Sequence, residues 1–207
     1  MSTFNRSIFS LSFIFISFSL LAEPTLEEVV VSARKVDESL QDVPIAMSVF
    51  TSSDIEDAGI QRPEDFIALT PNVVMANTVN VGDTLVTIRG LTSTRDAESN
   101  FAFVVDGVLQ TNPNAFNREL LDIAQIEVLK GPQGALYGRN ATSGAILITT
   151  KAPSEESEST AVIGMGINDS TKLQFVNSGK LRENVYTRFS VSTRDTDGEH
   201  TNVFSNS

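Results

Sequence analysis

The chain has no cysteine, no tryptophan and only one histidine, His200. Without cysteine it can form neither disulfides nor cysteine-ligated zinc sites, and one histidine cannot build a histidine metal cluster. A Ser–His catalytic pair would have to use His200, which lies in a polar segment near the end of the sequence. Composition therefore predicts no metal, no cofactor and no catalytic residues, and an enzyme is the least favoured class of protein.

Positive charge is also scarce. The 207 residues include 15 Lys and Arg against 26 Asp and Glu, which gives a formal net charge of -11. This acidity argues against a protein that binds nucleic acid. With 41% hydrophobic residues, the chain is long enough for one or two domains with a real core.

No apolar run is long enough for a transmembrane helix. The longest, residues 8–21, has about 14 residues, whereas a membrane span needs about 20. It follows the positive Arg6 and precedes the small residue Ala22, the pattern of a secretory signal peptide at residues 1–22. A membrane anchor is the alternative. The signal peptide predicts an exported protein.

The most distinctive stretch is residues 126–151, which reads as strand, compact loop, strand. Ile126 to Leu129 is a short apolar run with one charge, and residues 145–150 are apolar and β-branched. The loop between them holds four glycines, a number that indicates positive φ angles or close backbone contacts. A phosphate-binding loop is one interpretation, but the spacing does not match G-x-x-x-x-G-K-[ST]. A structural strand connection is the other.

The remaining residues up to 153 predict short strands mixed with short helices. Strands are expected at residues 44–50, 84–89 and 101–105, the last turned by Asp106-Gly107. A capping box at residues 53–56 predicts a helix closed by Gly59, Pro63 predicts the start of another, and residues 117–122 predict one helical turn. Together they predict an α+β domain over residues 40–153. Ahead of it, residues 23–39 predict a flexible segment, in which residues 28–33 form a short strand that either pairs with another protein or docks on its own domain.

Beyond Pro153 the character of the chain changes. Residues 154–159 are an acidic, serine-rich linker, and the residues after it alternate between apolar and polar in three stretches. Strands of about ten residues with one apolar face are typical of a transmembrane barrel, although a soluble β-meander has the same pattern. Residues 154–207 are thus expected to be a linker with antiparallel strands of an incomplete transmembrane β-barrel.

The string "KGPQGALYGRNATSGAILITTK", together with "IRGL" and "VVDGV", resembles the plug domain of TonB-dependent outer-membrane receptors, over roughly residues 26–153. The resemblance implies that Glu28, Val29, Val30, Val31, Ser32 and Ala33 form a TonB box that contacts TonB. It implies that Arg89 and Lys130 make salt bridges to acidic residues on the barrel wall. The plug signature then falls on Ile88, Gly90, Asp106, Gly107, Gly131, Pro132, Gly134, Tyr137, Gly138 and Gly144.

By this resemblance the chain is the N-terminal part of a receptor in the outer membrane, because only 54 residues (154–207) follow Pro153. The expected function is active uptake of a scarce solute, with a ferric siderophore or other iron complex as the first candidate. The expected partners are TonB with its inner-membrane energising complex, outer-membrane lipid, and a small-molecule ligand at loops 75–83, 92–100 and 110–117. The alternative is a secreted or periplasmic binding or signalling module without transport.

Overall fold

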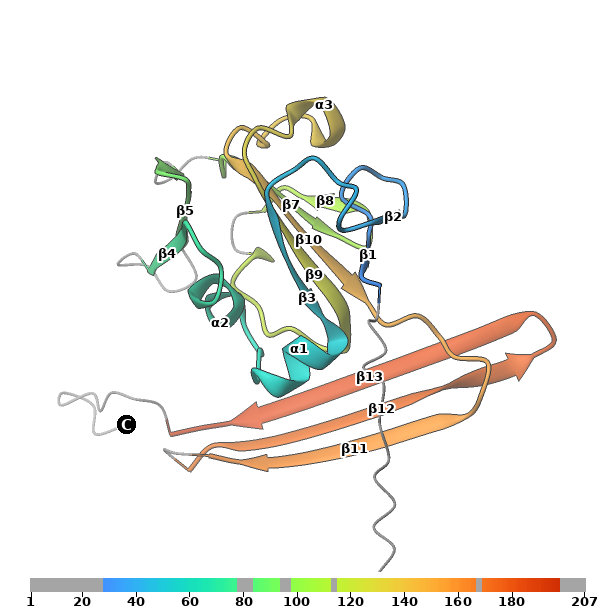
Figure 1. Ribbon diagram of the computed structural model, residues 1–207. Helices are drawn as coiled ribbons and strands as arrows, with labels where there is room; N and C mark the ends of the chain where they lie inside the picture. The colour runs from blue at the N-terminus through green and yellow to red at the C-terminus, as the bar shows by residue number, and fades with distance from the viewer. Residues whose placement is uncertain (1–27, 78–83, 94–97, 113–114, 167–168, 198–207) are drawn as a thin grey trace, which may run out of the picture.

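The computed structural model describes residues 28–77, 84–93, 98–112, 115–166 and 169–197. The signal peptide predicted at residues 1–22 lies outside these ranges. The described chain forms an α+β domain with a mixed sheet and short helices, followed by a three-stranded antiparallel sheet, as the sequence predicts (Figure 1). No helix among the described residues is long and apolar enough to cross a membrane.

The α+β domain is built on a five-stranded sheet with the order β3-β9-β10-β7-β8. Its strands are β3 (Met47–Thr51), β7 (Phe101–Val105), β8 (Val108–Gln110), β9 (Ile123–Lys130) and β10 (Gly144–Thr150). β10 is antiparallel to β9 and parallel to β7, so the sheet is mixed. Residues 126–129 of β9 and 144–148 of β10 are buried in succession, so both faces of these strands are covered, and apart from Glu127 these stretches carry no polar side chain.

One face of this sheet carries the main core. Ile126, Val128, Ile146 and Ile148 pack there with Phe116 and other buried residues. The Phe116 ring meets Phe66, Phe101 and Phe103 edge-on, with centroid distances of 6.4, 5.2 and 5.0 Å. Edge-to-face contacts of this kind add to the free energy gained by burying the rings.

The opposite face carries a smaller core, formed by Leu129, Ala145, Leu147 and Val104. The N-terminal segment covers this face through β1 (Val30–Val31) and β2 (Glu38–Ser39), which pair antiparallel. Ala33, from the same segment, is part of the smaller core and is fully buried.

Two helices follow β3 along the chain. α1 (Ser52–Asp57) and α2 (Pro63–Ala68) occur where the sequence predicts helices, and Pro63 is the first residue of α2. The capping box of α1 lies two residues earlier than predicted. Thr51 is the N-cap instead of Ser53, and Asp54 donates its backbone N–H to Thr51 while its carboxylate accepts the N–H of Thr51.

The cap gives a direct test of this register. Thr51→Ala is expected to reduce the free energy of unfolding by about 1 kcal/mol, because it leaves the N–H of Asp54 without its acceptor. Ser53→Ala is the control and should cost less than about 0.5 kcal/mol. Urea unfolding of both variants measures the difference, and a larger loss for Ser53→Ala would contradict the assigned N-cap.

A second, smaller sheet has the order β4-β5-β6, with β4 (Val73–Asn77), β5 (Thr84–Ile88) and β6 (Leu91–Thr92). The sequence analysis did not predict β4, and its last residues, 75–77, fall in the stretch 75–83 that was assigned to a loop. β4 pairs with the predicted strand β5, which supplies the backbone partners that a single sequence cannot reveal. Residues 117–122 contain no helical turn, contrary to the prediction, and lead directly into β9.

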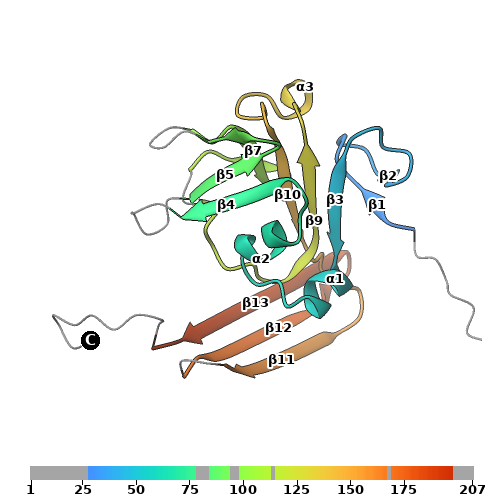
Figure 2. The ribbon, with the colours of Figure 1, turned by 60° about the vertical axis from the view of Figure 1, so that its left-hand side comes forward.

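The three-stranded sheet consists of β11 (Glu158–Met165), β12 (Thr171–Arg182) and β13 (Val185–Asp195). It lies at the end of the α+β domain that carries α1, whereas α3 (Gly134–Tyr137) lies at the opposite end (Figures 1 and 2). Polar side chains such as Arg188 face the domain, while Ile163, Met165, Phe175 and Phe189 are exposed on the outer face. The predicted alternation is confirmed.

Candidate functional site

The segment predicted to contact a partner, residues 28–33, is docked on its own domain. Val31 and Ala33 are buried, with 1% and 0% of their surface exposed, whereas Val30 is 49% exposed. Glu28 is exposed and Val29 is half-buried. Of the two possibilities that the sequence left open, the structure has the docked one. The contact with TonB stays a prediction.

Three side chains of the domain hold this segment by its polar groups. Ser32 donates its N–H and its hydroxyl to Oε1 of Glu127, at 3.0 and 3.1 Å. Gln125 donates Nε2–H to the carbonyl of Val30 at 3.0 Å, and Tyr137 donates its hydroxyl to the carbonyl of Ala33 at 2.8 Å. The segment is thus attached through its backbone as well as through two buried side chains.

Glu127 is the unusual member of this set, because it is only 2% exposed. Burial raises its pKa, the two hydrogen bonds from Ser32 lower it, and the charge of Asp37 raises it further. Its Oε2 atom is buried and has no hydrogen-bond partner among the described residues. Burial and then the charge of Glu127 raise the pKa of Tyr137 to about 12, so Tyr137 remains a hydrogen-bond donor at neutral pH.

The predicted signature residues form the turns that join the strands. Asp106 and Gly107 have φ angles of 47° and 79° and close the β7–β8 hairpin, as predicted. The carboxylate of Asp106 also accepts the backbone N–H of Thr150 at 2.8 Å. Ile88 is fully buried, and Gly90 after it has a φ of 82°.

The glycine-rich loop between β9 and β10 contains a short helix, α3, that the sequence analysis did not predict. Gly134 begins α3, and Gly138 ends it with a φ of 75°. Gly131 has a φ of 115°, and the adjacent Pro132 is exposed. α3 carries Tyr137, so the loop places the hydroxyl that binds the N-terminal segment.

Arg89 and Lys130 lie next to each other at the far end of the sheet from β11–β13. A Cβ atom at Gly131 would lie 3.3 Å from Nη1 of Arg89, and Lys130 donates Nζ–H to the hydroxyl of Ser48 at 3.0 Å. Burial and then the charge of Arg89 lower the pKa of Lys130. Neither side chain makes an ion pair within the described ranges, so their salt bridges to a barrel wall stay a prediction.

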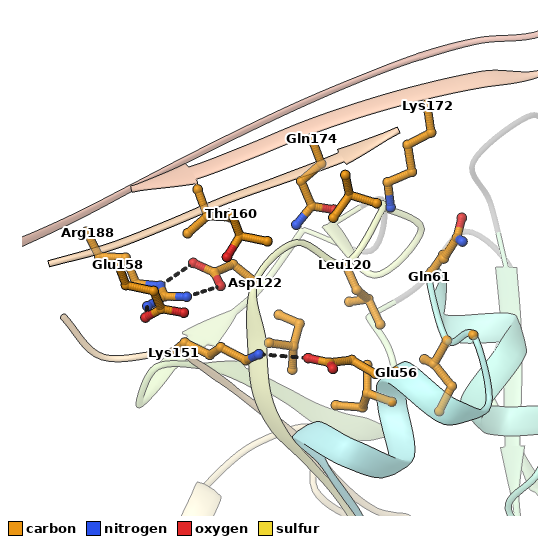
Figure 3. Close-up of a pocket in the computed structure, with 16 residues that line it drawn as sticks. Glu56, Gln61, Leu120, Asp122, Lys151, Glu158, Thr160, Lys172, Gln174 and Arg188 are labelled. Carbon is orange, nitrogen blue, oxygen red and sulfur yellow. Dashed lines mark hydrogen bonds and ion pairs between the residues drawn. The ribbon is translucent and has the colours of Figure 1, made fainter. Parts of the chain in front are cut away.

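The structure shows ion pairs between the α+β domain and the three-stranded sheet that sequence reasoning missed. Arg188 of β13 donates Nη2–H to Oδ1 of Asp122 at 2.7 Å and Nε–H to Oδ2, and both side chains are 10% exposed (Figure 3). Glu119 pairs with Lys172 and Arg194. The hydrogen bond from Arg188 lowers the pKa of Asp122, as does that from Ser190.

These pairs border a cavity of about 560 Å³ between the domain and β11–β13 (Figure 3). Its walls include Gln174 and Thr160 from the strands and Glu56, paired with Lys151 at 2.9 Å, from the domain. The polar positions of the alternating strands were visible in the sequence. Their acidic partners were not, because residues 117–122 carry no periodic pattern.

The fold and site define a protein of two parts. One is an α+β domain with its own N-terminal strand docked on it, and the other is an antiparallel sheet that is joined to this domain by ion pairs. Residues 39–145 match the family model of the TonB-dependent receptor plug domain. The chain belongs to this family, and its α+β domain is the plug domain.

Individual relatives agree with this family. The chain is 28% identical to the pesticin receptor of Yersinia enterocolitica over 162 residues, 78% of this chain and 24% of the relative. It is 33% identical to the vitamin B12 transporter BtuB of Vibrio vulnificus over 171 residues, 76% of this chain and 27% of the relative. The crystal structure of the ferric yersiniabactin uptake receptor FyuA from Yersinia pestis is similar, with a TM-score of 0.66 and 27% identity over 73% of this chain and 24% of that one. The chain thus spans about a quarter of the length of these relatives.

Proposed function

We propose that this chain provides the plug and the first wall strands of an outer-membrane receptor that takes up a scarce solute with energy delivered through TonB. The observation that carries the proposal is the strand-forming segment at residues 28–33, which is docked on the plug by hydrogen bonds from Gln125 and Tyr137 and to Glu127. A segment of this kind can add to the edge of a partner's sheet through its backbone groups. TonB, with its inner-membrane energising complex, is the proposed partner.

The faces of β11–β13 support a place in the outer membrane. Ile163, Met165 and Phe189 are 71%, 86% and 61% exposed on the face away from the plug. The opposite face directs Lys172 and Arg188 toward acidic residues of the plug. Lipid outside and a charged plug inside would satisfy both faces of a barrel wall. These strands are therefore proposed to lie against lipid.

An iron complex, such as a ferric siderophore, is the proposed solute. The similar structure FyuA, a ferric yersiniabactin uptake receptor, supports this, although the other two relatives are named for pesticin and for vitamin B12. The relatives are receptors and transporters by name, which favours transport over catalysis. Residues 75–83, 92–100 and 110–117, the stretches in which β4, β6 and β8 end, are proposed to contact the solute, and each lies partly outside the described residues.

The role of residues 28–33 can be tested at Val30, whose side chain is half exposed. Val30→Pro is expected to abolish energised uptake while leaving solute binding intact, because proline removes a backbone donor and fixes φ. The measurement is uptake of a radiolabelled ferric siderophore by cells that depend on this protein for that siderophore. Val30→Ala is the matched control, since it keeps the backbone donor and should preserve uptake. Uptake at the wild-type rate in Val30→Pro would remove the assignment of the box.

A further inference from the structure

Both edges of the short strand β1 are occupied in this structure. On one edge β1 pairs with β2, and Leu40 donates its N–H to the carbonyl of Val29 at 2.9 Å. On the other edge, the carbonyl of Val30 accepts from Gln125 and the N–H of Ser32 donates to Glu127. A partner that adds a strand needs the free backbone groups of one edge. Side chains of β9 therefore stand where a partner strand would bind.

Glu127 is an unexpected residue for this position. The register of the sheet places it in a row with Leu147 of β10 and Val104 of β7, both of which belong to the smaller apolar core. A carboxylate buried in such a row costs free energy unless it is fully hydrogen-bonded. Oε1 is satisfied by Ser32, whereas Oε2 has no partner among the described residues. Docking of the segment thus gains two hydrogen bonds and loses hydration of the same carboxylate, so the two effects oppose each other.

We propose that Gln125 and Glu127 form an internal binding surface for residues 30–32 that competes with the strand-adding partner, and that Glu127 is the positioning residue that sets how readily the segment is released. This inference rests on the proposed function only for the identity of the partner. A valine at position 127 would hold the segment by apolar contact alone. The carboxylate instead binds the same Ser32 N–H that a partner strand would bind.

The competition is expected to depend on pH. When the segment leaves, Glu127 meets water and its pKa returns toward the ordinary value, so the docked state holds the proton more tightly. Docking is therefore strongest at low pH and weakens as the pH rises from the ordinary carboxyl pKa through the raised one. Other ionisable groups nearby are Asp37, Lys35, whose ammonium lies 5.5 Å from the centre of the Tyr137 ring, and Tyr137 itself.

The absence of cysteine from the chain allows a clean test by thiol labelling. Val31→Cys, placed in the intact protein as it is produced in cells, reports release of the segment, because Val31 is 1% exposed when docked. In this background, Glu127→Ala leaves the N–H and the hydroxyl of docked Ser32 without their acceptor, a loss that outweighs the hydration cost of the carboxylate. The variant is therefore expected to speed labelling about tenfold or more and to tighten binding of the isolated periplasmic domain of TonB by a similar factor. Glu155→Ala, an exposed carboxylate in the linker, is the matched control and should change neither. An unchanged labelling rate in Glu127→Ala would overturn the inference.

Two further measurements separate release from unfolding and from a wrong partner. Val86→Cys, fully buried elsewhere in the plug, should stay protected in every variant. If Glu127→Ala exposes Val86→Cys, this variant has loosened the plug as a whole. Glu127→Gln, which keeps the shape of the side chain, then takes its place in the test. With Glu127, labelling of Val31→Cys relative to the exposed Val30→Cys should slow at least about threefold from about pH 8 to about pH 5, and with Glu127→Gln it should not change. The same pH trend in both would overturn the inference. Faster labelling without tighter TonB binding would uphold the internal surface and refute TonB as the partner.

Discussion

Gly144→Ala is expected to destabilise the plug domain by about 3 kcal/mol or more, which is at the upper end of the cost of overpacking. A Cβ atom at this position would lie 2.3 Å from the carbonyl oxygen of Leu129 and 3.1 Å from Cδ1 of Ile88. The first contact is with backbone of β9, whose hydrogen bonds to β10 begin at this pair of strand ends. β9 cannot move away without breaking that ladder. Urea unfolding of the intact chain measures the loss.

Gly134→Ala is the matched control for this prediction. A Cβ atom there meets nothing within 4 Å, and Gly134 begins α3 without a positive φ. Alanine is the better helix former, so the variant should be neutral or up to about 1 kcal/mol more stable. Equal stability of Gly144→Ala and the unchanged chain would contradict the close approach of β9 and β10 at this residue.

Strand positions could be predicted from the sequence where an apolar composition is bounded by residues that end strands. Residues 126–129 and 145–150 are apolar and bounded by glycine and proline, and both lie in long buried strands. The Asp106-Gly107 turn and the start of α2 at Pro63 carry local signals that need no tertiary partner. β4 and α3 were missed for the opposite reason. β4 exists by pairing with β5, and α3 is one turn within a glycine-rich loop whose propensity opposes a helix.

The contacts of the candidate site depend on register, which the sequence does not contain. Glu127 reads as one charge within an apolar run, and only the pairing of β9 with β10 shows that it is buried beneath Ser32. Arg89 and Lys130 are far apart in sequence, and they are neighbours because the guanidinium of Arg89 lies beside Gly131, the residue after Lys130. The sequence could not decide whether residues 28–33 dock on their own domain or pair with a partner, because a short apolar strand can do either.

Arg188→Ala is expected to destabilise the docking of the plug against β11–β13 by about 3–5 kcal/mol, the typical cost of breaking a buried ion pair. Arg188 and Asp122 are each 10% exposed and share two hydrogen bonds, and Ser190 also donates to Asp122. Removing the guanidinium leaves the mostly buried carboxylate with one side-chain donor, Ser190. Arg139→Ala is the control. Its pair with Glu98 is 65% and 52% exposed, so its loss should cost about 0–1 kcal/mol.

A double-mutant cycle and a pH series together assign this loss to the pair. Because Arg188 lowers the pKa of Asp122, the contribution of the pair is present above the ordinary aspartate pKa and is lost as the pH falls through the lowered one. Arg188→Ala should therefore raise the pH at which the plug undocks on acidification. In thermal unfolding of the intact protein, Arg188→Ala combined with Asp122→Ala should cost about 2 kcal/mol less than the sum of the single changes. Additive losses, with an unchanged acid transition, would mean that the two side chains stabilise the protein separately and that the plug is held to the wall by other contacts.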